Sequence, residues 1–417
     1  MSTSQQTFVI VGGGLAGAKA AEALRERGFG GRVVLIGAEL TRPYERPPLS
    51  KGYLTGKAKL ASVFVHDETF YAERSVELLT STTVTGLGLA DQTVHLSDGS
   101  TLRFDKALLA TGAQPRQLTV PGAELAGVHY LRTVADADAL IAAAGSATSV
   151  AVIGAGWIGS EIAASLRTRG LAVTLIEPSA VPLERVLGRE VGEVYRDLHA
   201  RHGVDLRLGE GVAALHGGRR VEEVLTTAGT RVGADLVVAG VGATPRTRLA
   251  AEAGLSVDDG VVTDEYLRTS HPNVYAAGDV ARAWHPVFGA RVRVEHWANA
   301  LNQGPAAAAN MLDAREPYTR VPYFFSDQYD LGMEYSGYCP DWDQVVFRGD
   351  PGAGGFIAFW LRDGVVAAAM NANVWDVSEH LRQLVRDRLR VPVEHLADPG
   401  VPVETLLAAP SGAMTEE

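Results

Sequence analysis

Two stretches of the chain repeat one pattern of apolar and polar positions. In each, a short apolar run leads into a glycine-rich turn, an amphipathic helical pattern and a second apolar run that ends near an acidic residue. Strand, turn, helix and strand in this order predict a parallel βαβ unit, so we expect an α/β chain with two such units. The expected strands are Thr7–Val11, Arg32–Ile36, Ser149–Ile153 and 172–176, and the expected helices are 18–27 and one that ends at Arg169.

Both glycine-rich turns have the spacing G-x-G-x-x-G, in which each glycine has a physical reason. The first permits a tight turn, the second lets the backbone approach a pyrophosphate, and the third lets the helix pack on the strand. The helix that follows offers free N–H groups and a partial positive charge to the phosphates. The residues expected to bind in the two turns are Gly12, Gly14, Ala16 and Gly17, and Gly154, Gly156, Trp157, Ile158 and Gly159.

An acidic residue follows each turn at a distance that suits ribose binding. Glu39 lies 22 residues after Gly17, and Glu177 lies 18 residues after Gly159. One G-x-G-x-x-G is weak evidence, but two copies with strand, helix and acid in register predict two dinucleotide sites. The alternative is two Rossmann-like units that bind no nucleotide.

Two sites suggest a tightly held FAD and an exchangeable nicotinamide. A carboxylate at 177 repels a 2′-phosphate and favours NADH over NADPH, although Arg185 is close enough in sequence to qualify this.

Composition narrows the class of protein. A length of 417 residues predicts two or three domains, and a net charge of −11 makes a nucleic-acid partner improbable. No apolar run reaches the roughly 18 residues of a membrane span, and the start of the chain does not read as a signal peptide. The single cysteine, Cys339, excludes an intrachain disulfide, a CxxC pair and a cysteine-ligated cluster. We therefore expect a cytoplasmic protein without a membrane partner or a metal site.

Further short motifs follow in a fixed order, at 42–51, 108–113, 130–133, 240–245, 274–279 and 294–297. In this order and spacing they resemble the flavoprotein reductases with two dinucleotide domains. The match is nearer to the FAD- and NAD-dependent ferredoxin reductases of bacterial oxygenase systems, the putidaredoxin-reductase and biphenyl-dioxygenase-reductase type with the pyridine nucleotide-disulfide oxidoreductase fold. The motifs cover the chain from Val9 to about Val377.

The resemblance implies a domain order as well as further binding residues. An FAD domain at 1–114 and 245–320 is expected to be interrupted by an NAD domain at 115–244, and a C-terminal α+β domain at 321–417 completes the chain. The strand-like runs 344–348 and 356–361 lie in that last domain. The cofactor-binding residues implied outside the two turns are Arg46, Lys51, Val84, Ala110, Thr111, Gly112, Arg132, Gly242, Gly278, Asp279, Glu295, His296 and Trp297.

Two residues are expected to act in catalysis. A cation beside the flavin stabilises the negative charge that develops on reduction, and the resemblance places Lys51 there. Glu161, expected in the first turn of the second phosphate-binding helix, would repel a pyrophosphate if it pointed at it, so it is predicted to point away and to pair with Lys51. The alternatives are a solvated loop lysine and an ordinary first-turn glutamate.

The absence of cysteine before Cys339 excludes the cysteine pair that disulfide reductases use, so electrons are expected to leave directly from the flavin. Cys339 itself is expected to be a structural or a surface thiol. The resemblance implies a 2Fe-2S ferredoxin as acceptor, feeding a monooxygenase or dioxygenase. The alternatives are an NADH oxidase or diaphorase, and a redox-gated binding protein like apoptosis-inducing factor.

Two expectations concern the C-terminal part. Four arginines are predicted to lie on one helix that can meet an acidic ferredoxin, although Glu379, Asp387 and Glu394 reduce the net charge of that segment to +1, which favours a solvated helix face. These arginines are Arg382, Arg386, Arg388 and Arg390. The end of the chain, 410–417, is expected to be a disordered tail.

Overall fold

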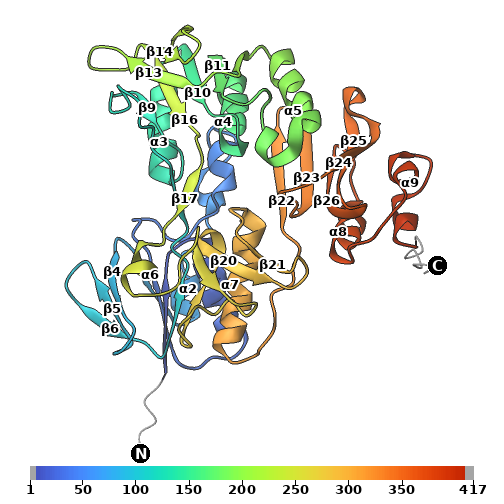
Figure 1. Cartoon of the computed structure of the whole chain (residues 1–417). Coiled ribbons are helices and arrows are strands. Elements are labelled where there is room, and N and C mark those ends of the chain that lie inside the picture. The colour runs from blue at the N-terminus through green and yellow to red at the C-terminus, as the bar shows by residue number, and fades with distance from the viewer. Residues whose placement is uncertain (1–5, 409–417) are drawn as a thin grey trace, which may run out of the picture. The chain divides into compact units, whose positions relative to one another are not determined.

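The computed structural model describes residues 6–408, which form two compact units (Figure 1). The first unit contains 6–45, Leu60–Gln114 and Thr244–Pro322, and the second contains Arg46–Lys59, Pro115–Ala243 and 323–408. Neither unit is continuous in sequence, and each has its own hydrophobic core. The expected tail at 410–417 lies outside the described residues.

The first unit is built on a parallel sheet with the strand order β19-β7-β1-β2-β3. Its strands span Val274–Ala276, Lys106–Leu109, Thr7–Val11, Arg32–Ile36 and Val76–Leu79. The first two expected strands are therefore confirmed at both ends. The helix between them, α1, spans Leu15–Glu26 and begins earlier than expected, because Gly14 is its N-cap and the last glycine of the turn is helical.

Both faces of this sheet are covered, which is why its strands are continuous apolar runs rather than alternating ones. Alternate residues of β1 point to opposite faces, with Phe8 and Ile10 in one core cluster and Val9 and Val11 in the other. The first cluster includes residues of α1 and of α7 (Trp297–Met311).

The other elements of the first unit are two short helices and two three-stranded sheets. The helices are α2 (Phe70–Glu73) and α6 (Arg248–Glu252). The strands are β4 (Val84–Gly88), β5 (Thr93–Leu96), β6 (Thr101–Arg103), β18 (Val261–Thr263), β20 (Ala281–His285) and β21 (Ala290–Val292).

The second unit contains a parallel sheet of the same kind, with the strand order β12-β11-β10-β16-β9. Its strands span Asp205–Leu208, Ala172–Glu177, Ser149–Ile153, Leu236–Ala239 and Val128–His129, and a further sheet contains β13 (Val212–His216), β14 (Glu223–Thr226) and β15 (Arg231–Gly233). The second pair of expected strands is confirmed, with one more residue, Glu177, in β11. The helices are α3 (Val134–Ala144), α4 (Trp157–Thr168) and α5 (Glu184–Arg201).

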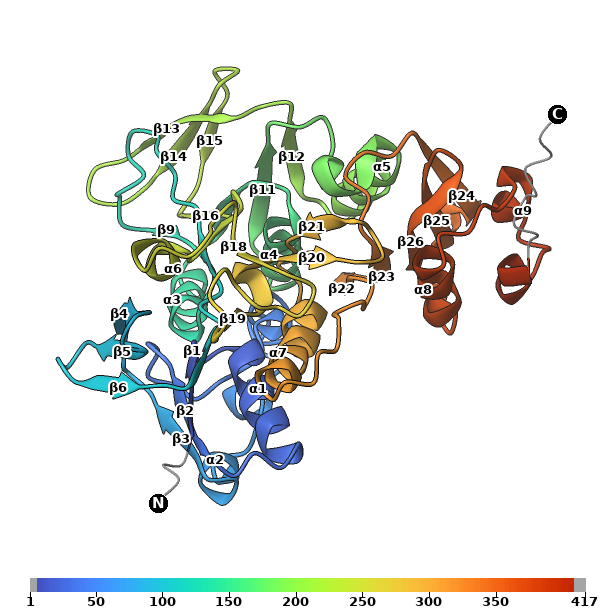
Figure 2. The same ribbon diagram turned by 60° about the horizontal axis from the view of Figure 1, so that its bottom comes forward.

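The last part of the second unit is an antiparallel sheet with the strand order β22-β23-β26-β25-β24. Its strands span Tyr323–Gln328, Leu331–Gly337, Val365–Ala372, Gly355–Arg362 and Gln344–Asp350, and the helices α8 (Ser378–Arg386) and α9 (Val393–Ala397) follow. The two strand-like runs expected here are confirmed as β24 and β25. Figures 1 and 2 both show α5 beside this sheet, where the indole N–H of Trp360 donates to the carbonyl of Leu187 over 3.0 Å.

The expectation of four arginines on one helix is wrong. Helix α8 ends at Arg386 because Arg388 adopts a left-handed conformation with φ 52°. The N–H groups of Arg388 and Leu389 then bond back to the carbonyls of Val385 and Leu384, which is the hydrogen-bond pattern of a helix terminus. Arg388 and Arg390 are therefore outside the helix.

The two arginines that remain on α8 already have partners. Arg382 pairs with Glu379 over 2.7 Å, and Arg386 pairs with Asp387 over 3.2 Å. Within 6–408 no helix is both long enough and apolar enough to span a bilayer.

Helices α1 and α7 lie in close contact at Gly304 of α7, and a substitution there tests this contact. A Cβ added to Gly304 would lie 2.3 Å from the carbonyl oxygen of Ala16. We expect Gly304→Ala to destabilise the protein by about 2 kcal/mol, because overpacking outweighs the roughly 1 kcal/mol that alanine gains in a helix. Gly30→Ala is the control, since a Cβ there meets no described atom within 4 Å. Urea unfolding of both variants measures the difference, and equal stabilities would contradict the close contact.

Candidate functional site

The first glycine-rich turn is shaped by backbone contacts that leave no room for side chains. Gly12 has φ +129°, and a Cβ there would lie 2.0 Å from the carbonyl oxygen of Ala110. A Cβ on Gly17 would lie 2.1 Å from the carbonyl oxygen of Gly12. Gly14, in contrast, has no described atom within 4 Å of its Cβ position. The turn is therefore closed on the protein side and open on the side where a pyrophosphate would bind.

The second turn repeats this geometry in the second unit. Gly154 has φ +92°, and its Cβ would lie 2.5 Å from the carbonyl oxygen of Gly240. The Cβ of Gly159 would lie 1.9 Å from the carbonyl oxygen of Gly154, whereas Gly156 again faces open space among the described residues. The three glycines have the same three environments in both copies.

Both helices that follow the turns begin without a side-chain cap. Gly14 is the N-cap of α1 and Gly156 is the N-cap of α4, and neither cap position has a side-chain hydrogen bond. The first-turn N–H groups and the positive end of each helix dipole are thus available to an anion. The two sites fit the pyrophosphates of two dinucleotides.

The two acidic residues differ in their surroundings. Glu39 accepts a hydrogen bond of 2.5 Å from the hydroxyl of Tyr44. Glu177 accepts the N–H of Ala155 over 2.6 Å and the N–H of Ser179 over 3.0 Å. Glu177 therefore stabilises the glycine-rich turn through these two hydrogen bonds. It is also the residue that is expected to bind a ribose hydroxyl. Arg185 is exposed in the first turn of α5.

Three segments meet at the start of α1 in the first unit. The N–H of Gly278 donates to the side chain of Gln303 over 2.8 Å, and a Cβ on Gly278 would lie 3.2 Å from that of Ala16. Asp279 follows directly, and its charge acts on His296, the N-cap of α7. Burial lowers the pKa of His296 to about 4, and Asp279 opposes this shift. Ala16, Gly278, Asp279 and His296 are thus gathered around one helix start.

The other residues implied for the first unit are placed as follows. Trp297 is the first residue of α7, and Val84 is the first residue of β4. Thr111 donates to the carbonyl of Arg246 over 2.9 Å, and Gly112 has φ +69° in the same turn after β7. Glu295 forms an ion pair with Arg293.

The residues implied for the second unit are anchored in different ways. Arg46 donates to the carbonyl of Arg132, and the carbonyl of Gly242 accepts the N–H of Arg116 over 2.9 Å. The ring of Trp157 packs against Phe324 with 4.7 Å between the ring centroids, so its ring is part of the core. Ile158 is 40% exposed at the start of α4.

Lys51 and Glu161 form a buried ion pair in the second unit. The Nζ atom of Lys51 lies 2.7 Å from Oε1 of Glu161, and the side chains are 17% and 7% exposed. Ser50 donates to Oε2 over 2.6 Å, and Ser326 donates to Oε1 over 2.7 Å. The predicted contact between the two residues is confirmed, whereas their catalytic role stays a prediction. Glu161 is the fifth residue of α4 and so lies in its second turn, not in the first as expected, because the helix begins at Trp157.

The contribution of β22 to this ion pair was not predicted from the sequence. Along β22 the buried residues alternate, and they are Phe324, Ser326 and Gln328. Polar residues at two successive inward positions of a strand signal a buried hydrogen-bond network, which is the clue that was available. Phe325, on the other face, lies with its ring centroid 5.7 Å from the Nζ atom of Lys51.

Cys339 is buried in the core between α5 and the C-terminal sheet. Burial raises the pKa of its thiol to about 11. The prediction that Cys339 is a structural thiol is therefore confirmed, and the alternative prediction of a surface thiol is wrong.

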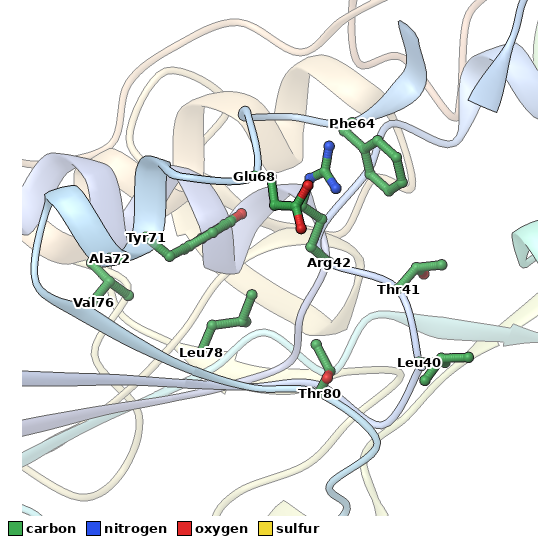
Figure 3. A pocket seen from close by; sticks show the side chains of 10 residues that line it. All are labelled: Leu40, Thr41, Arg42, Phe64, Glu68, Tyr71, Ala72, Val76, Leu78 and Thr80. Atoms are coloured by element: carbon green, nitrogen blue, oxygen red, sulfur yellow. The ribbon is translucent and has the colours of Figure 1, made fainter. Parts of the chain in front are cut away.

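The first unit also contains an open cavity of about 510 Å³ near the loop that follows Glu39 (Figure 3). It is lined by Leu40, Thr41, Arg42, Phe64, Glu68, Tyr71, Ala72, Val76, Leu78 and Thr80. The guanidinium of Arg42 lies 3.7 Å from the ring centroid of Phe64, and the buried hydroxyl of Tyr71 has no hydrogen-bond partner among the described residues. The cavity was not predicted from the sequence, and of its lining residues only Arg42 belongs to one of the short motifs, 42–51.

Each parallel sheet is followed by a helix that begins at a glycine and has no side-chain cap, which defines a protein with two dinucleotide sites. Comparison with known families supports this class of protein. Residues 6–304 match the family described as pyridine nucleotide-disulphide oxidoreductase, and residues 323–407 match the family described as reductase C-terminal. The chain belongs to the pyridine nucleotide-disulphide oxidoreductase family. Membership implies FAD and a nicotinamide dinucleotide, which confirms the cofactors predicted from the two turns.

The most similar proteins include reductases of oxygenase systems. The chain is 37% identical over 412 residues to putidaredoxin reductase CamA of Pseudomonas putida, covering 97% of this chain and 98% of that one. It is 39% identical over 407 residues to the ferredoxin–NAD(+) reductase component of the anthranilate 1,2-dioxygenase system of Burkholderia cepacia, covering 97% and 100%. Both confirm the resemblance stated from the motifs.

Solved structures confirm the fold. The reductase in the covalent putidaredoxin reductase–putidaredoxin complex has a TM-score of 0.94 and 37% identity, covering 98% of this chain and 99% of that chain. The fold class expected from the sequence, two dinucleotide-binding domains and a C-terminal domain, is therefore right.

The surroundings of Glu177 lead to a prediction on nucleotide choice. We expect Glu177→Arg to lower the ratio of kcat/KM for NADH over NADPH at least tenfold, because it replaces a charge that repels a 2′-phosphate by one that attracts it. Glu177→Gln is the matched control, since its amide oxygen still accepts the N–H of Ala155 that the carboxylate holds. Initial rates with both nucleotides measure the ratio, and an unchanged ratio in the arginine variant would assign specificity elsewhere.

Proposed function

We propose that this chain is an NADH-dependent, FAD-containing ferredoxin reductase that delivers electrons to a 2Fe-2S ferredoxin of a monooxygenase or dioxygenase system. The observation that carries the proposal is the combination of two open, uncapped dinucleotide sites with a sequence that has no cysteine before Cys339. A cysteine pair cannot relay the electrons, so they leave from the flavin itself. The names of the relatives, which are ferredoxin reductase components, support this choice of acceptor.

FAD, when bound, accepts two electrons from the nicotinamide and returns them singly to a one-electron acceptor. The chain's own residues bind and orient the two dinucleotides. The start of α1, with Gly12, Gly14 and Gly17, holds the FAD pyrophosphate, and Asp279 accepts hydrogen bonds from the ribityl chain. The start of α4, with Gly154, Gly156 and Gly159, holds the nicotinamide dinucleotide, and Glu177 selects NADH.

Lys51 supplies the positive charge that stabilises the reduced flavin, and Glu161 fixes that charge. A buried ammonium group costs much free energy unless it is paired, and the contact of 2.7 Å with Glu161 offsets this cost. The two serine hydroxyls on the carboxylate leave Glu161 little freedom to move. The pair thus presents one oriented ammonium group.

The expected domain division is part of the proposal. The FAD domain at 1–114 and 245–320 is interrupted by the NAD domain at 115–244, and 321–417 forms the C-terminal domain. The proposed location is the cytoplasm, because a chain with one buried thiol has no need of an oxidising compartment.

The first experiment is anaerobic stopped-flow reduction of the FAD-loaded protein by NADH, followed by mixing with an oxidised 2Fe-2S ferredoxin. Rapid bleaching and then one-electron reoxidation at a catalytic rate is the expected result. Rapid bleaching without transfer to any ferredoxin, together with an NADH-dependent change in oligomeric state, would favour a redox-gated binding protein. Fast reoxidation by oxygen or quinones instead would favour an oxidase or diaphorase.

The role of Lys51 gives a second prediction. We expect Lys51→Ala to slow flavin reduction by NADH about 100-fold while FAD stays bound, because an oriented charge at the site of developing negative charge is lost. Lys57→Ala is the control, since Lys57 is exposed and belongs to the same segment. Single-turnover stopped flow measures the rate, and FAD absorbance after gel filtration measures retention. A rate equal to that of the control would remove Lys51 from the mechanism.

A further inference from the structure

Behind the ion pair, a line of buried polar side chains runs from Glu161 into α5. Ser326 donates to Oε1 of Glu161 over 2.7 Å, and Nε2 of Gln328 lies 3.4 Å from Oγ of Ser326. Nε2 of His199 lies 3.0 Å from Oε1 of Gln328. All four residues are buried, with exposed fractions of 6% for Glu161, 1% for Ser326 and Gln328, and 0% for His199. The line connects α4, β22 and α5 within the second unit.

The direction of each hydrogen bond in this line follows from the charge of Glu161. An ionised carboxylate can only accept, so the single hydroxyl proton of Ser326 must point to Glu161. The oxygen of Ser326 is then left as an acceptor. The atom of Gln328 that faces it must be the amide nitrogen, which leaves the amide oxygen of Gln328 facing His199.

The same logic fixes the protonation of His199. An amide oxygen only accepts, so Nε2 of His199 must carry a proton. Burial lowers the pKa of His199 to about 4, so the ring is neutral near pH 7 and its Nδ1 atom is bare. The hydroxyl of Tyr329 lies 3.5 Å from Nδ1, where it can donate to the bare nitrogen. Every donor in the line therefore points toward Glu161.

We infer that Ser326, Gln328 and His199 are positioning residues for Glu161, and that their one-directional hydrogen-bond chain holds the carboxylate oxygen Oε1 in place against Lys51. This inference rests on the proposed catalytic role of the Lys51–Glu161 pair. Aligned hydrogen bonds polarise one another and strengthen the last bond, here the one to the carboxylate. Oε1 of Glu161 accepts from both Lys51 and Ser326, so turning the carboxylate away from Lys51 would also leave the hydroxyl of Ser326 without its acceptor. Because the residues behind Ser326 cannot redirect their donors without breaking buried hydrogen bonds, the chain keeps Oε1 facing Lys51.

Other charged or titratable groups face the two ends of the chain. Those that act on or contact Glu161 are Lys51, Asp327 and Tyr195, and those near His199 are His202 and Tyr329, with Arg167 acting on Tyr329. Among the described residues, no carboxylate forms an ion pair with His199. The amide of Gln328 is thus the partner that decides the tautomer.

The direct test is nitrogen NMR of the FAD-loaded protein labelled with ¹⁵N-histidine, because it reads the tautomer without turnover. The signal of His199 is identified by its loss in His199→Gln. We expect a neutral ring protonated on Nε2 at every pH from 5.5 to 8.5. In Gln328→Met, which offers His199 no oxygen to accept its proton, we expect the form protonated on Nδ1 to become populated. A ring protonated on Nδ1 in the unchanged protein, or the same tautomer in both proteins, would overturn the inference.

The effect on the reaction is tested at Gln328. Gln328→Glu keeps the shape of the side chain, but both of its carboxylate oxygens can only accept hydrogen bonds. The oxygen that faces Ser326 therefore competes with Glu161 for the hydroxyl proton of Ser326, and the negative charge favours a protonated His199. We expect flavin reduction by NADH to slow about tenfold, because the carboxylate loses a hydrogen bond and no longer holds Lys51 in one orientation. Gln344→Glu is the control, since it adds the same charge at an exposed position of the same sheet.

A second variant guards against a folding defect. Gln328→Met keeps the buried volume and breaks the chain without adding a charge, and we expect it to slow flavin reduction as well. If both variants fold and reduce flavin at the rate of the control, the inference is overturned. If the tautomer of His199 responds to Gln328→Met while Glu161→Gln keeps the full rate of flavin reduction, the chain stands and the proposed role of Glu161 fails.

Discussion

The structure depends on a backbone contact that only glycine permits. In each parallel sheet, the turn after the first strand lies so close to the neighbouring strand and to its own helix that a Cβ at Gly12 or Gly17 would lie within about 2 Å of a carbonyl oxygen. This close approach sets the helix start directly at the strand end, without space for a capping side chain. The free N–H groups of α1 and α4 are therefore a consequence of the packing, and they are also what a dinucleotide phosphate needs.

A second constraint acts on the ion pair of the second unit. An unpaired carboxylate at the position of Glu161 would be strongly unfavourable, because its surroundings exclude water. Its partners come from two places in the chain: Lys51 and Ser50 from the 46–59 segment, and Ser326 from β22. The carboxylate of Glu161 thus ties the C-terminal sheet and the 46–59 segment to α4. Ions held in this way gain orientation rather than stability, which suits a site that must present a charge.

Local patterns were sufficient for much of the fold. Four strands of the two βαβ units could be predicted, because continuous apolar runs bounded by glycines have few alternatives in an α/β protein. The strands β24 and β25 were also predicted, but not their antiparallel pairing. The ends of the helices could be predicted less accurately than the strands. The sequence offers no glycine at the end of α8, so the left-handed residue Arg388 and the loss of two arginines from the helix were not foreseen. The turn position of Glu161 was missed for a similar reason, since the start of α4 depends on the turn packing.

By itself, the sequence determined the two phosphate-binding turns, the acids beyond them and the order of the family motifs, because these depend on residues that are neighbours in the chain. The repulsion between a carboxylate and a phosphate predicted that Glu161 points away from its turn, and the resemblance, which places Lys51 beside the flavin, predicted that the two residues pair. Only the tertiary structure decided which hydroxyls surround that carboxylate and which atoms continue the line to His199. Apart from the contact between Ser326 and Gln328, which are two positions apart, those contacts join residues 111 to 165 positions apart, and no local pattern specifies them. Burying a polar group without a partner is unfavourable, and this applies only once the sheets have packed together. That requirement selects those contacts.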